Sequence, residues 1–207
     1  MKEVLVITDS LCGLSSEQAP EYNVMVVPYH IVFDGKDYPD NAIDREKLFT
    51  RLESYQKLPT HSACTTGEIL EAYKKASRSG KSILFIALSS SMSADYNAAL
   101  QTKESAKKEI PDIAIEVDDS RSVISGELLV VLAAARASKE GKGLSEVVRI
   151  ARQVVQKVSL INVPETLFFF ERSGGSGGEP NVAKAPIPIY PLLAMDGSTG
   201  KAGKFIG

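Results

Sequence analysis

Residues 82–93 read SILFIALSSSMS, a mostly apolar run that leads directly into a cluster of hydroxyl side chains. A continuous apolar run predicts a strand buried on both faces, which is typical of parallel sheets. Residues 4–10, VLVITDS, repeat the pattern with another polar end. Helix-like segments follow both runs. The sequence therefore predicts βαβ units, in which helices cover both faces of a parallel sheet.

The same alternation continues to about residue 157. The apolar pattern predicts strands near Val4, Val24, Ile83 and Ile113, with amphipathic helices over 44–56, 68–79, 94–108, 125–140 and 144–157. We expect the second strand to continue through the alternating residues 29–33, and residues 34–36 (DGK) to turn the chain. The predicted fold class is α/β, with a Rossmann-like parallel sheet.

The composition changes near residue 158. Residues 158–163 predict a strand, whereas 173–178 (SGGSGG) have the composition of a flexible linker and 185–191 (APIPIYP) exclude a helix. We therefore expect an α/β domain over residues 1–157. Residues 158–207 are expected to be an incomplete part of a second, smaller α/β domain, rich in glycine and proline.

Composition narrows the class of protein. Apolar residues make up 43% and charged residues 24%, as in ordinary globular chains. A net charge of −2 predicts no nucleic-acid partner, and no apolar run approaches the ~20 residues of a membrane span. The opening apolar stretch is too short for a signal peptide, so we expect a cytoplasmic protein. Cys12 and Cys64 make neither a disulfide framework nor a metal site, and we expect both to be buried thiols.

Polar clusters follow several predicted strands, where ligands of doubly wound sheets bind. They lie at 8–10 (TDS), 89–93 (SSSMS), 118–120 (DDS) and in the hydroxyl-rich loop 60–66 (THSACTT). Ser93 lies where a helix is predicted to begin, so its hydroxyl and neighbouring amides could hold a carboxylate or phosphate. The alternative is that Ser91 or Ser93 simply caps that helix.

Residues that could support catalysis are few. Asp9 could serve a small-molecule transferase or phosphatase as a nucleophile or metal ligand, or it could cap the following turn. His30 lies in a strand pattern and is expected to be structural, whereas for His61 a structural and a ligand-binding role remain open. None of the common nucleotide-binding, zinc-protease or serine-hydrolase motifs occurs.

The polar segments together resemble the DegV family of bacterial fatty-acid-binding proteins. The family motifs V-T-D-S, V-V-P-L, P-T-T-S-Q-P-S-x-x-E, L-S-S-x-L-S-G-T-Y and V-x-D-S correspond to VITDS at 6–10, VVPY at 26–29, PTHSACTTGE at 59–68, LSSSMSADY at 88–96 and VDDS at 117–120. The motifs occur in the family's order and spacing over about residues 3–172.

The resemblance implies a non-catalytic carrier that has no cofactor or metal and binds one long-chain fatty acid, such as palmitate, between two domains. It implies that a partner fatty-acid kinase receives the carboxylate for phospholipid synthesis, with transient membrane-surface contact. It assigns the carboxylate contacts to Ser93 and to His61, where the family has threonine, with Ser62 beside it. Secondary candidates are Thr60, Thr8, Ser10 and Ser120.

The chain also departs from the family pattern. Ala94 and Asp95 replace the usual glycine and threonine, which puts a carboxylate beside the head-group site; it would repel an acid unless it points away. The segment 173–178 lacks the family's arginine. These departures leave open a regulatory module that has kept the fold and lost the ligand.

Overall fold

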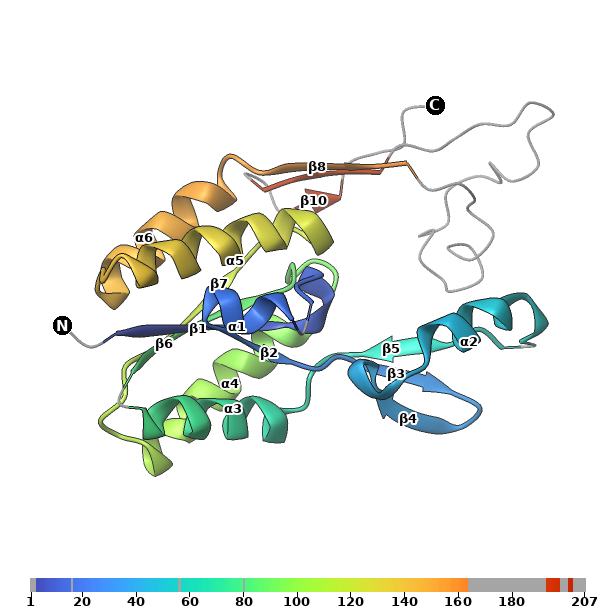
Figure 1. Cartoon of the computed structure of the whole chain (residues 1–207), viewed down its shortest axis with the longest axis horizontal. Coiled ribbons are helices and arrows are strands. Elements are labelled where there is room, and N and C mark those ends of the chain that lie inside the picture. Colours follow the sequence, from blue (N-terminus) through green and yellow to red (C-terminus); the bar gives the residue numbers. More distant parts are fainter. Residues whose placement is uncertain are drawn as a thin grey trace.

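The computed structural model describes residues 3–15, 17–55, 57–79, 81–163, 193–197 and 201–202. At its centre is a parallel four-stranded sheet in the order β2-β1-β6-β7 (Figure 1). The strands are β1 (Val4–Asp9), β2 (Val24–Val27), β6 (Ser82–Ala87) and β7 (Ile115–Asp119). Every residue of β1 and β6 is buried, as their uninterrupted apolar runs predict.

Helices cover both faces of this sheet, which confirms the predicted fold class (Figure 1). Val4 and Val6 of β1 pack on the side of α1 (Gln18–Tyr22), α5 (Ile124–Lys139) and α6 (Leu144–Val155). Leu5 and Ile7 point the other way, toward α3 (Thr66–Arg78) and α4 (Asp95–Glu109). The period-two alternation of a strand thus divides the core into two apolar clusters.

A small antiparallel sheet was not expected. It has the order β4-β3-β5, and its strands are β3 (His30–Phe33), β4 (Lys36–Pro39) and β5 (Thr60–Ser62). The prediction that β2 continues through residues 29–33 is therefore wrong. Pro28 has no backbone N–H to give to a ladder, and the chain leaves the parallel sheet there. The expected loop at 60–66 begins instead as strand β5.

The helix expected over 44–56 is shorter than predicted. Asp44 caps α2 (Arg45–Thr50) by accepting a hydrogen bond from the Lys47 amide at 3.0 Å, as the sequence suggested. A separate 3-10 turn, Leu52–Ser54, follows. Both lie beside the small sheet (Figure 1).

The described part of residues 158–207 forms a third sheet. Its order is β10-β9-β8, with β8 (Ser159–Asn162), β9 (Leu193–Asp196) and β10 (Lys201–Ala202) pairing antiparallel. The Gly197 amide donates to the Val158 carbonyl at 3.0 Å, which ties this sheet to the end of α6. The expected segments 173–178 and 185–191 lie outside the described residues. Among the residues described, no helix combines the length and apolar character that a membrane crossing needs.

Candidate functional site: a hydroxyl and imidazole cluster at the carboxyl edge of the sheet

Ser93 lies in the loop between β6 and α4, at the edge where the parallel strands end. It is half-buried, and its Oγ accepts a hydrogen bond from the Asp95 amide at 3.0 Å. Asp95 is the first residue of α4, so Ser93 satisfies one of the amides that a helix leaves free at its N-terminus. The capping interaction therefore exists, and it leaves the hydroxyl proton of Ser93 available for another partner.

Three of the candidate residues lie around Tyr29. Its hydroxyl forms a hydrogen bond with Ser93 Oγ, and its backbone amide donates to Ser10 Oγ at 2.9 Å. Its ring centroid lies 6.0 Å from that of His61. Ser10, His61 and Ser93 thus meet around a tyrosine that is only 1% exposed. Sequence reasoning missed Tyr29 as a site residue, because its contact with Ser93 joins positions 64 residues apart.

Strand alternation separates the three candidates in β5. His61 pairs with Ile31, while Thr60 and Ser62 pair with Val32 and His30. Successive side chains of a strand point to opposite faces, so His61 lies on one face of the small sheet and Thr60 and Ser62 on the other. The contact with Tyr29 identifies the face of His61 as the one that belongs to the Ser93 cluster.

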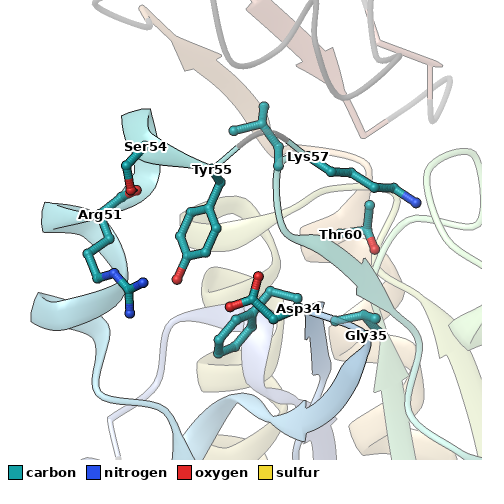
Figure 2. Close-up of a pocket in the computed structure, with 10 residues that line it drawn as sticks. Asp34, Gly35, Arg51, Ser54, Tyr55, Lys57 and Thr60 are labelled. Carbon is teal, nitrogen blue, oxygen red and sulfur yellow. The ribbon is translucent and has the colours of Figure 1, made fainter.

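Thr60 instead lines a cavity of about 520 Å³. Figure 2 shows Arg51, Tyr55 and Asp34 around this space, with Thr60 on the opposite side. Neither His61 nor Ser93 lines it. The cavity and the Ser93 cluster are therefore separate features of the small sheet and its surroundings.

Thr8 and Ser120 are placed in the interior. Both side chains are fully buried. Thr8 Oγ1 donates to Glu127 Oε1 at 3.1 Å, and Ser120 Oγ donates to the Ser122 carbonyl at 3.0 Å. Their hydroxyl protons are used inside the protein, and the structure does not bring them into the group around Tyr29.

Three carboxyl groups lie close to this site with no exposed surface: Asp9, Asp95 and Glu127. Burial raises the pKa of all three, and the charge of Asp9 helps to raise the pKa of Asp95 to about 7. Neither carboxyl oxygen of Asp95 has a hydrogen-bond partner among the described residues. Asp95 is therefore a buried carboxyl close to Asp9 and Tyr29, and it carries its charge at a cost.

Asp9 does not have the surroundings of a nucleophile. Its carboxylate accepts hydrogen bonds from the Leu11 amide at 2.9 Å and the Leu88 amide at 3.0 Å, and it caps the 3-10 turn Ser10–Cys12. Within the described ranges, no cluster of three or more His, Cys, Asp or Glu side chains could hold a metal ion. The capping alternative raised for Asp9 is the one that the geometry supports.

Both cysteines are buried and unpaired, as expected. Burial raises the pKa of Cys12 to about 11 and raises the pKa of Cys64 as well. A thiol that keeps its proton at neutral pH is a poor nucleophile. The two side chains thus serve as small parts of the two apolar clusters.

His30 links the small sheet to α3. Its Nδ1 lies 2.9 Å from Asp37 Oδ1, and its Nε2 lies 2.9 Å from Glu68 Oε1. A ring that donates to two carboxylates must carry two protons, so this arrangement requires the imidazolium form. Glu68 also completes a capping box with Thr65 at the start of α3. The expectation that His30 is structural agrees with these contacts.

We expect the free energy of unfolding to fall by about 1 kcal/mol as the pH rises through the pKa of His30. Burial opposes the charge of His30, but its hydrogen bonds to Glu68 and Asp37 outweigh burial and raise its pKa. A raised pKa means that the contribution is complete below the unfolded pKa of about 6.5 and is lost above the folded pKa. Urea titrations of wild type and His30→Gln at pH 6 and pH 9 measure it. An equal pH dependence of the two proteins would contradict this assignment.

Comparisons with known proteins match most of the chain. The family model described as "Uncharacterised protein, DegV family" matches residues 3–205. A DegV domain-containing protein of Clostridium perfringens is 30% identical over 192 residues, which cover 93% of this chain and 68% of the relative.

Solved structures share the fold. A stearic-acid-binding protein from Eubacterium ventriosum is similar with a TM-score of 0.84 and 22% identity, over 99% of this chain and 69% of that one. A DegV family protein from Ruminococcus gnavus, refined with vaccenic acid, is similar with a TM-score of 0.85 and 21% identity, over 98% of this chain and 72% of that one.

Proposed function

Since this chain belongs to the DegV family, we propose that it binds one long-chain fatty acid and holds the carboxylate at Ser93 and His61. The observation that carries the proposal is the half-buried Ser93 hydroxyl, which lies in one cluster with His61 through Tyr29. The similar proteins from Eubacterium ventriosum and Ruminococcus gnavus, with stearic and vaccenic acid, support the choice of ligand class.

The chemistry of a fatty acid suits such a cluster. Burial of the acyl chain contributes about 0.8 kcal/mol for each methylene group, so the tail supplies most of the affinity. The carboxylate then needs only a few donors to fix its position. Ser93 supplies a hydroxyl, and His61 supplies an N–H in either protonation state. The opposition from Asp95 is reduced, because its pKa of about 7 lets it remain protonated for part of the time.

The other candidates take supporting positions in this proposal. Ser10 holds the Tyr29 backbone, and Thr8 and Ser120 stabilise the interior behind the cluster. Ser62 and Thr60 lie on the opposite face of β5 from His61 and are outside the direct contacts. The acyl chain would run between the domain of residues 1–157 and that of residues 158–207.

The role that we propose is non-catalytic. A carboxylate held at a half-buried edge remains accessible to a second protein, and a partner fatty-acid kinase that makes an acyl phosphate for phospholipid synthesis would use that access. Transient contact with a membrane surface would let the carrier exchange its ligand. Asp9, the residue that an enzymatic alternative needs, is fully buried and bonded to two backbone amides.

Native mass spectrometry with added palmitate tests the proposal. We expect one palmitate to bind each chain with the affinity of a buried acyl tail, and hexadecanol to bind more weakly because it lacks the charged acceptor. Lipid extracted from the protein as purified should contain fatty acid. A protein that carries no lipid and takes up no palmitate would instead be the regulatory module that has kept the fold and lost the ligand.

A further inference from the structure

Tyr29 places a phenolic hydroxyl among the buried side chains of an apolar cluster. It follows β2 directly after Pro28 and packs in the apolar cluster between the sheet and helices α3 and α4. Only 1% of its surface is exposed, and its hydroxyl reaches Ser93, which is 64 residues away in the sequence. A buried phenol needs a partner, but one in the interior would satisfy it equally well. Its partner is instead the half-buried serine of the proposed head-group site.

The hydrogen bonds of Ser93 can be counted. A serine hydroxyl has one proton to donate and two positions at which it can accept. The Asp95 amide occupies one accepting position. The Tyr29–Ser93 hydrogen bond uses one of the two hydroxyl protons of the pair. Ser93 is the one hydrogen-bond partner of the buried Tyr29 hydroxyl among the described residues, so the phenol proton is satisfied only if Tyr29 donates. Ser93 then keeps its own proton. Both accepting positions of Ser93 are then filled.

Tyr29 also keeps its own proton. Burial raises its pKa above the ordinary value, and the charges of Asp95 and Asp9 act in the same direction. The phenol therefore keeps the proton that it can donate to Ser93 at neutral pH. A donated hydrogen bond also polarises the hydroxyl that receives it and makes its remaining proton a better donor.

We propose that Tyr29 is a positioning residue that turns Ser93 into a dedicated hydrogen-bond donor and thereby makes the site select an ionised carboxylate over an uncharged head group of the same chain length. This inference rests on the proposed function, because it concerns the selectivity of the same site. A ligand hydroxyl that needs to donate finds no accepting position on Ser93. A carboxylate, which only accepts, matches the one proton that remains.

The test compares palmitate and hexadecanol binding to wild type, Tyr29→Phe and Tyr29→Leu. Loss of the tyrosine hydroxyl frees one accepting position on Ser93, so the ratio of palmitate to hexadecanol affinity should fall about 5- to 10-fold. Tyr29→Leu, which also lacks the hydroxyl, should shift the ratio in the same direction. Tyr73→Phe is the matched control. Tyr73 is fully buried in the same apolar cluster, but its hydroxyl bonds to the Ala99 carbonyl at 3.4 Å, so the ratio should not change.

A second background separates positioning from a merely structural role. In Ser93→Ala protein, Tyr29→Phe should leave the palmitate to hexadecanol ratio unchanged, because the hydroxyl through which Tyr29 acts is gone. If Tyr29→Phe weakens the binding of palmitate and of hexadecanol equally, the inference is wrong. It is also wrong if Tyr29→Phe shifts the affinity ratio by the same factor in Ser93→Ala protein. Neither result contradicts the proposal that the protein binds a fatty acid. If the wild type binds no palmitate, the proposed function fails and this inference fails with it.

Discussion

Replacing Ser93 with alanine is expected to weaken palmitate binding roughly 10- to 150-fold. The variant loses a hydrogen bond to a charged group, which contributes about 1.5–3 kcal/mol. The acyl tail keeps its own contacts, so binding should be weakened rather than abolished. Titration of palmitate into wild type and variant, followed by calorimetry or fluorescence, measures the change.

Ser91→Ala is the matched control for this substitution. Ser91 lies two residues earlier in the same loop, is exposed, and has a hydrogen bond to Ser89 Oγ at 2.9 Å. It should leave palmitate affinity unchanged. Stability should fall by about 1 kcal/mol or less in Ser93→Ala, since only one amide of α4 loses its acceptor. Equal effects of the two substitutions on palmitate affinity would mean that Ser93 is only part of a helix start.

Replacing Asp95 with asparagine is expected to stabilise the protein at pH 8 by about 2 kcal/mol, with a ceiling of about 4 kcal/mol. Burial and the charge of Asp9 raise the pKa of Asp95 from 3.8 to about 7. Between these values the folded protein holds a proton that the unfolded chain has lost. The contribution of the protonated Asp95 side chain to the free energy of unfolding is therefore fully present below pH 4. It is lost as the pH rises through about 7. Asparagine has the same shape and no charge.

The measurement is the free energy of unfolding in urea at pH 5 and pH 8. Wild type should lose stability between these values, and Asp95→Asn should lose less. Asp44→Asn serves as the control, because Asp44 is exposed and asparagine caps a helix as well as aspartate does. If Asp95→Asn is no more stable than wild type at pH 8, then the buried charge of Asp95 does not destabilise the folded protein, which would contradict this prediction.

The parallel sheet could be predicted because each of its strands is marked by a pattern within one continuous segment of the sequence. The apolar runs at β1 and β6 are long enough to identify strands buried on both faces, and a helix follows each of them. The small antiparallel sheet could not be predicted in the same way. Its strand β5 is a three-residue, exposed, polar segment, and it is a strand only because it pairs with β3, about 30 residues away.

In the candidate site too, residues within a sequence motif could be predicted, whereas residues that matter through long-range contacts could not. Ser93 could be identified from its motif, and His61 from its place in a hydroxyl-rich segment. Tyr29 could not, because its significance comes from a contact across 64 residues. The opposite directions of His61 and Ser62 follow from strand alternation and were hidden as long as the segment was expected to be a loop. The burial of Thr8 and Ser120 likewise depends on α5 and the loop before it.

A crystal structure of the protein with palmitate tests the central claim most directly. We expect a carboxylate oxygen about 2.5–3.0 Å from Ser93 Oγ, with the His61 ring beside it and the acyl chain leading away from the edge of the parallel sheet. Palmitate whose carboxylate lies instead in the cavity between Arg51 and Thr60, or away from Ser93 at any other place, would contradict the assignment of the site.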